Sequence, residues 1–238
     1  MAVNSYDESL TDSLKRFAPT LIAIGAILAV LLIGFFGFRW YQDRNGTEAV
    51  SSSNFIRDYN FRAGKKDASV KLVYGFDLQC PACKTANTPL KEFAAEYKDK
   101  IEFVYKNFPL SIHPFAKPAA YGLQASQRQD KFLDYKDKIF ESQSQLNTNT
   151  IEKAGQDLGL DMNRWNSDRN SREIRDQVDQ DSSDFTSIKL PNSTFGSEGN
   201  SPSATPSHII IKDGKIVDWW SGGVSVDDYK IRIDKYLN

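Results

Sequence analysis

Apolar residues are distributed unevenly along this chain of 238 residues, and their first cluster has the length of a membrane span. From Ala18 to Phe38 the sequence APTLIAIGAILAVLLIGFFGF contains no charged residue. As a helix rising 1.5 Å per residue it would reach roughly 31 Å, which matches the hydrocarbon thickness of a bilayer. An arginine and two aromatic residues follow at 39–41, as is typical of a membrane boundary. The pattern predicts a single uncleaved transmembrane helix over residues 18–38.

The charges on the two sides of this span do not decide its orientation. Lys15 and Arg16 precede the span and Arg39 and Arg44 follow it, so the positive-inside rule gives no answer. A cleaved signal peptide is the alternative, but its apolar core would be shorter and a small-residue cleavage site would follow it. The polar, serine-rich residues 39–60 show little periodicity and predict a juxtamembrane linker.

Two short apolar runs with a helical pattern between them predict a β–α–β unit. VKLVYGF, residues 70–76, and IEFVYKNF, residues 101–108, have the length and β-branched content of buried strands. Pro81 suits the first position of the intervening helix, where its missing N–H costs nothing, and Phe93 and Tyr97 lie on one face of that helix. The order strand, helix, strand predicts a parallel pair joined by a crossover helix.

Residues 114–188 change to helical periodicity. Apolar side chains recur there at three- and four-residue spacing, which predicts a helical block. Asn149 with Glu152 resembles a capping box, and Asp161 is placed to cap a further short helix. The Ser/Gly/Pro-rich segment 190–206 that follows is predicted to be a long loop.

Strand signals return after this loop. In SHIIIKDGKIVDWW, Asp213-Gly214 is a strong signal for a two-residue hairpin turn. Ser225 and Asp228 then predict the start of a terminal helix. The chain therefore predicts an α/β domain in which a helical block separates two strand regions.

Composition supports a packed core and excludes one class of function. Hydrophobic residues make up 40% of the chain and aromatic residues 12%, which is enough apolar surface for one substantial domain. The formal net charge of −1 and the absence of a strongly basic segment argue against a nucleic-acid-binding protein.

The two cysteines, in the sequence FDLQCPACKT, carry the candidate chemistry. A structural disulfide between Cys80 and Cys83 would close almost no loop and would stabilise the fold little. A zinc site would need further ligands, and His113 and His208 stand at spacings unlike a compact zinc module. Redox chemistry remains, and neither a metal nor a cofactor is expected.

A strand that leads into C-P-A-C and then into a helix places Cys80 at the helix start. Unpaired N–H groups and the positive end of the helix dipole favour its thiolate, so Cys80 is the expected nucleophile. Cys83 lies one turn further along and is expected to be more buried. It is placed to attack a mixed disulfide, the step that completes thiol–disulfide exchange.

Several motifs together resemble the DsbA-like branch of the thioredoxin superfamily. They are G-x-x-D-A-x-V from Gly64, F-D-x-Q-C-P-x-C from Phe76, N-F-P-L from Asn107, His113-Pro114 and Thr205-Pro206. The resemblance covers residues 61–238 and implies a thioredoxin fold split by a helical insertion at about 114–188. It also implies export from the cytoplasm, which would leave residues 1–17 as a cytoplasmic tail.

The resemblance assigns further roles at the site. It implies that Pro206 is a cis-proline facing the cysteines and that Thr205 offers backbone groups to an extended substrate peptide. Pro81 and Ala82 would support the two catalytic cysteines. The strongest oxidants of the family have histidine where this chain has Ala82, so the pKa of Cys80 is expected to be less depressed here. A second departure is Ala204, where the family usually places glycine.

These expectations combine into one functional hypothesis. The chain is expected to be a membrane-anchored protein thiol–disulfide oxidoreductase, with its catalytic domain outside the cytoplasm, that introduces disulfides into exported proteins. Its expected partners are the cysteine thiols of those proteins, a redox partner that reoxidises the CPAC pair, and the membrane through residues 18–38. The alternatives are a reductase or isomerase with the same site, and a non-catalytic, membrane-tethered peptide-binding module.

Overall fold

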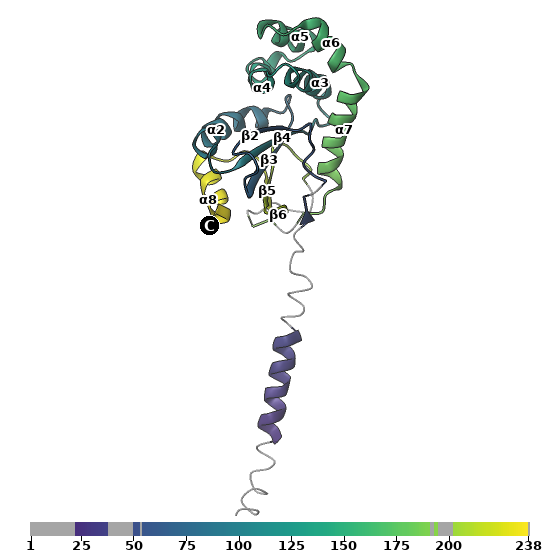
Figure 1. Cartoon of the computed structure of the whole chain (residues 1–238). Helices are drawn as coiled ribbons and strands as arrows, with labels where there is room; N and C mark the ends of the chain where they lie inside the picture. Colours follow the sequence, from purple (N-terminus) through teal and green to yellow (C-terminus); the bar gives the residue numbers. More distant parts are fainter. Residues whose placement is uncertain (1–21, 38–49, 53, 191–192, 195–201, 238) are drawn as a thin grey trace, which may run out of the picture. The chain divides into compact units, whose positions relative to one another are not determined.

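The computed structural model describes residues 22–37, 50–52, 54–190, 193–194 and 202–237 (Figure 1). The chain divides into two compact units, 1–48 and 49–238. In the first unit, residues 22–37 form a helix with exposed side chains. Both ends of the predicted anchor, 18–21 and 38, lie outside the described residues, as do the predicted tail 1–17 and residues 39–49. Among the helices of the described residues, none is long and apolar enough to cross a membrane.

The second unit is built on a six-stranded sheet in the order β1-β6-β5-β3-β4-β2. The strands are β1 Val50–Ser51, β2 Phe61–Gly64, β3 Val70–Phe76, β4 Glu102–Asn107, β5 Ser207–Lys212 and β6 Lys215–Ser221. β3 and β4 pair in parallel, which confirms the predicted β–α–β unit, and the other neighbours are antiparallel.

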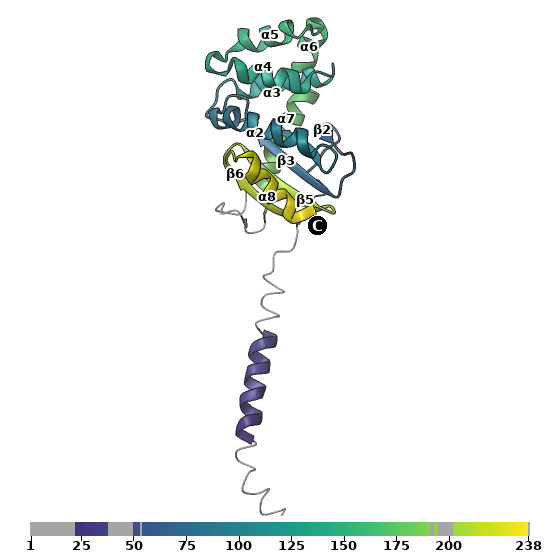
Figure 2. The same ribbon diagram turned by 90° about the vertical axis from the view of Figure 1, so that its left-hand side faces the viewer.

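Helices cover both faces of the sheet (Figures 1 and 2). They are α2 Pro81–Tyr97, α3 Ala116–Gln127, α4 Phe132–Glu141, the short 3-10 helix η1 Gln143–Gln145, α5 Thr148–Asp157, α6 Met162–Arg169, α7 Arg172–Ser187 and α8 Val226–Leu237. Alternation along β3 sends Leu72 and Tyr74 into the core under α2 and α8, and Val73 into the core under α7. Helices α3 to α7 form the predicted insertion between β4 and β5.

Residues 50–52 and 54–60 belong to the domain, which corrects the prediction that the linker extends to residue 60. β1 pairs with β6, and Phe55 is only 4% exposed. The Lys106 ammonium donates to the Phe55 carbonyl at 2.6 Å, and Asn60 donates to the Asp181 carboxylate at 2.9 Å. One aromatic anchor and buried polar contacts hold this segment, so it lacks the apolar periodicity that would have revealed it.

The predicted capping box of α5 is displaced by two residues. Asn147, not Asn149, is the N-cap, and its side chain accepts hydrogen bonds from the N–H groups of Asn149 and Thr150. The Thr150 hydroxyl accepts the Asn147 N–H in return, so threonine takes the place expected for Glu152. The other start signals are confirmed: Asp161 caps α6, and the Ser225 hydroxyl accepts the Asp228 N–H at the start of α8.

The predicted hairpin turn is present between β5 and β6. Asp213 and Gly214 have φ values of 49° and 76°, as a two-residue hairpin turn with both central residues left-handed requires. The register pairs Ser207 with Ser221 and Lys212 with Lys215, so the turn lies at the end of the sheet where β3 begins. Most of the predicted loop 190–206 lies outside the described residues.

Candidate active site

The two cysteines lie where β3 ends and α2 begins. Cys80 is the N-cap of α2, with extended backbone angles of −74° and 120°, and Pro81 is the first helical residue, as predicted. The Cys80 carbonyl accepts the first hydrogen bonds of the helix, from the N–H groups of Cys83 at 3.1 Å and Lys84 at 3.2 Å. Both cysteines are free thiols. We call residues 77–83 the catalytic turn.

The environment of Cys80 favours its ionised form. A hydrogen bond from the Cys83 thiol is the main cause that lowers the pKa of Cys80, from 9.0 to about 5. Hydrogen bonds from Thr205 and from the backbone N–H groups of Cys83 and Ala82 also lower this pKa. Partial burial of the sulfur acts in the opposite direction and raises it. At neutral pH the sulfur of Cys80 is therefore a thiolate.

Cys83 has the opposite character. It is fully buried, and burial raises the pKa of its thiol. Its sulfur accepts a hydrogen bond from the Asp77 N–H at 3.4 Å. The pair thus combines a thiolate at the helix start with a protonated thiol inside the core, an arrangement suited to exchange chemistry.

The Thr205–Pro206 segment faces the cysteines from the other side. Its peptide bond is cis, as the resemblance implied, and both residues are buried. The Cys80 thiol lies 3.4 Å from the Thr205 carbonyl, to which it donates when protonated. Pro81 and Ala82 are exposed beside the pair. The structure therefore brings together all six residues singled out from the sequence.

Asp77 is a site residue for which no role was predicted, although it stands in the F-D-x-Q-C-P-x-C motif. Its carboxylate is 1% exposed and accepts the N–H groups of Gln79 at 2.7 Å and Leu110 at 2.9 Å. The same carboxylate lies 2.7 Å from His113 Nδ1. These bonds orient the Asp77 N–H that reaches the Cys83 sulfur. His113 supports the catalytic turn in this way.

His208 is part of the core beneath the site. It lies in β5 and is fully buried, and burial is the main cause that lowers its pKa to about 3. Its ring stacks on Trp220, with centroids 4.4 Å apart, and its Nε2 is 2.7 Å from the Tyr229 hydroxyl. A neutral, stacked imidazole of this kind serves packing.

A groove of about 580 Å³ opens directly beside the catalytic turn. It lies between the first half of α2 and the segment that leads into α8. Its lining residues are Ala82, Thr85, Ala86, Pro89, Gly223, Val224, Ser225 and Asp228. Most of these side chains are small or apolar, so the groove offers a surface for a polypeptide next to Cys80.

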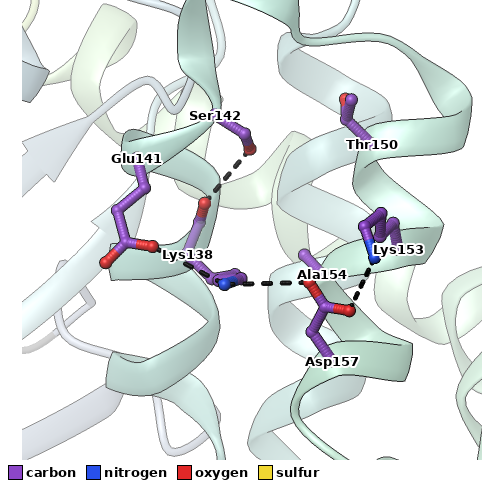
Figure 3. Close-up of a pocket in the computed structure, with 7 residues that line it drawn as sticks. All are labelled: Lys138, Glu141, Ser142, Thr150, Lys153, Ala154 and Asp157. Atoms are coloured by element: carbon purple, nitrogen blue, oxygen red, sulfur yellow. Dashed lines mark hydrogen bonds and ion pairs between the residues drawn. The ribbon is translucent and has the colours of Figure 1, made fainter.

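A second pocket, of about 310 Å³, lies between α4 and α5 and contains no site residue (Figure 3). Its charges are paired with one another. Lys138 lies 3.7 Å from both Glu141 and Asp157, and Lys153 lies 2.9 Å from Asp157. This pocket offers no free charge to a ligand.

Comparison with known proteins agrees with this geometry. A sequence profile described as thioredoxin matches residues 57–195, more than half of the chain. The chain belongs to the thioredoxin family.

Curated relatives are similar to this chain in sequence, and solved structures are similar to it in fold. The chain is 29% identical over 184 residues to a probable disulfide bond formation protein D of Bacillus anthracis, a match that covers 71% of this chain and 83% of that protein. Wolbachia pipientis alpha-DsbA1 is similar in fold, with 17% identity and a TM-score of 0.64, and the match covers 76% of this chain and 92% of that protein. The catalytic domain of Proteus mirabilis ScsC is also similar in fold, with 19% identity and a TM-score of 0.61. That match covers 78% of this chain and 93% of the ScsC domain. With its cysteine pair, this thioredoxin-family chain is a thiol–disulfide oxidoreductase.

Proposed function

We propose that this chain donates a Cys80–Cys83 disulfide to the thiols of exported proteins. The asymmetry of the pair carries the proposal: the pKa of Cys80 is lowered to about 5, whereas that of the buried Cys83 is raised. A stabilised Cys80 thiolate favours the reduced state of the pair, and this is what makes a disulfide an oxidant. The relative named as a disulfide bond formation protein supports the same direction.

The exchange is balanced in two steps. A substrate thiolate attacks the Cys80 sulfur of the disulfide, so that a mixed disulfide forms and Cys83 leaves as a thiolate that takes up a proton. A second substrate thiolate then attacks the substrate sulfur and releases Cys80 as a thiolate. Two electrons pass from the substrate to the pair, and a redox partner must remove them before the next cycle.

The residues around the pair have proposed roles in holding the substrate. Thr205 and Pro206 would present their backbone to an extended peptide beside Cys80, which binds main chain without demanding one side chain. The groove beside Ala82 would take the flanking residues of that peptide. Pro81 starts α2 next to Cys80, and its fixed backbone angle sets the direction of the first N–H groups of that helix.

The direction of transfer is tested by measuring the reduction potential of the full chain against glutathione and its rate of disulfide donation to a reduced, unfolded protein. We expect a potential above that of thioredoxin, about −270 mV, and donation that Cys80→Ser abolishes. A potential at or below this value, with fast reduction of protein disulfides, would identify a reductase. Absence of both activities would leave a peptide-binding module.

We propose further that residues 18–38 anchor the chain in the cell membrane, with the catalytic domain outside the cytoplasm. The uncharged run has the length of a span, and its described part, 22–37, is helical. The proposed substrates, exported proteins, are outside the cytoplasm as well, where disulfides persist.

Protease treatment of intact cells and spheroplasts tests this topology. We expect the protease to remove the domain 49–238 and to leave a membrane-bound fragment that sediments with lipid. A domain that stays protected until the membrane is lysed would contradict the proposed orientation. A chain that is washed from membranes by high salt or carbonate would contradict the anchor.

A further inference from the structure

The helical insertion reaches the backbone of the catalytic cysteine through one side chain. Gln143 lies in η1, between α4 and α5, and is partly buried. Its Nε2 donates to the Leu78 carbonyl at 2.9 Å and to the Cys80 carbonyl at 3.0 Å. One amide group of the insertion therefore holds two carbonyl groups of the catalytic turn, those of Leu78 and Cys80.

Two further contacts join the insertion to the same turn, from the loop that opens the insertion. The Gln79 side-chain oxygen accepts the Phe115 N–H at 2.7 Å, and Asp77 accepts the N–H of Leu110. These contacts hold the start of the turn. Gln143 differs from them because it acts on Cys80 itself, from a point 63 residues along the chain.

The Cys80 carbonyl is linked to the sulfur through the first turn of α2. That carbonyl also accepts the N–H of Cys83, and the N–H groups of Cys83 and Ala82 are among those that stabilise the Cys80 thiolate. A rotation of the Cys80 peptide group would therefore displace the donors that face its sulfur. The two bonds from Gln143 oppose this rotation.

We propose that Gln143 is a positioning residue through which the helical insertion holds the Cys80 backbone in its reactive orientation. The proposal rests on the proposed function only in taking Cys80 as the reactive thiol. Gln143 does not touch the sulfur and is not catalytic. The insertion therefore contributes to the geometry of the active site in addition to packing against the rest of the domain.

Two substitutions and a matched control test this role in the full chain. Gln143→Met keeps the length and removes the donor, and Gln143→Glu keeps the shape and replaces the donor by a charged acceptor. Gln145→Glu is the control, because it makes the same chemical change in η1 at an exposed residue. The readouts are the pKa of Cys80 from thiolate absorbance, the reduction potential and the unfolding temperature.

For Gln143→Met we expect the pKa of Cys80 to rise by about 0.5 to 1, because the backbone N–H donors that face its sulfur lose their fixed direction. The equilibrium constant for oxidising a substrate should fall about threefold to tenfold, which lowers the potential by about 15 to 30 mV. Gln143→Glu should raise the pKa and lower the potential more than Gln143→Met does, because the negative charge of the glutamate disfavours the Cys80 thiolate. Gln145→Glu should change neither.

The outcomes separate this inference from the proposed function. An ordinary pKa for Cys80 in the unaltered chain would remove the basis of the positioning role and of the proposed disulfide donation. A depressed pKa that stays the same in Gln143→Met would overturn the positioning role alone. Equal shifts in Gln143→Glu and Gln145→Glu would also overturn it, since they would reflect general charge. Loss of folding in Gln143→Met would do the same, because a residue that only positions the turn is not needed for folding.

Discussion

Ionisation of Cys80 should make the stability of the reduced protein depend on pH. The pKa of this thiol is about 5 in the folded chain against an ordinary value of 9.0, with hydrogen bonding by Cys83 as the main cause. Because the folded pKa is the lower one, the contribution is complete above the unfolded pKa and is lost as the pH falls through about 5. Between these values the free energy of unfolding should rise with pH.

The size of the effect follows from the shift. Four pKa units would correspond to about 5 kcal/mol if the thiolate were fully shielded from water. Screening by solvent makes the contribution of such interactions smaller than the full pKa shift indicates, so we expect about 2 to 3 kcal/mol. At neutral pH roughly half of the contribution is present, because the pH then lies midway between the two pKa values.

The assay compares the reduced wild type with Cys80→Ser, whose hydroxyl does not titrate in this range. Urea unfolding is followed by the fluorescence of the buried Trp165, Trp219 and Trp220, at pH values from about 4 to about 9. The difference in unfolding free energy between the two proteins should grow with pH by the amount given. A difference that does not change with pH would refute the assignment of Cys80 as a stabilised thiolate.

Three other predictions concern the same fold. Ala82→His should lower the pKa of Cys80 further, because a protonated imidazole beside the sulfur adds charge stabilisation, and should raise the reduction potential; an unchanged potential in glutathione titrations would contradict this. Iodoacetamide should alkylate Cys80 well before Cys83 near neutral pH, as mass spectrometry of the fragments will show, and equal rates would contradict the assignment. The Lys106 ammonium lies 3.0 Å from the buried Asp181 carboxylate. Lys106→Met should destabilise the domain by about 3 to 5 kcal/mol, because it leaves Asp181 buried without this partner, and a loss below about 1 kcal/mol in urea unfolding would show that the ion pair contributes little.

The elements predicted best were those with a strong local signal. β3 and the start of α2 could be read from the sequence because a run of buried residues is followed within a few positions by a cysteine and by a proline at the first helical position. The hairpin at Asp213-Gly214 is equally local, because only a few residue types accept its backbone angles. Local signals of this kind also indicated Cys80, Cys83 and Pro81, whereas the roles of Ala82, Thr205 and Pro206 came from the family resemblance.

The parts that were missed depend on contacts between distant residues. β2 has four residues and an alternating, half-exposed pattern, so it stands out little from a polar segment. The bonds from Gln143 to Cys80 and from Asp77 to Leu110 join side chains to backbone groups 63 and 33 residues away. No spacing rule connects such positions. These contacts become visible only when the insertion is folded against the sheet.

The position of β1 has a mechanical consequence. Val50 lies beside Ile216, near the hairpin, whereas the catalytic turn follows Phe76 at the opposite end of the sheet. A strand of this length spans roughly 20 Å. Val50 and Ser51 therefore join the sheet at the end of the domain that does no chemistry. A load applied to the chain at Val50 would pass through β1 and β6 before it could disturb Cys80.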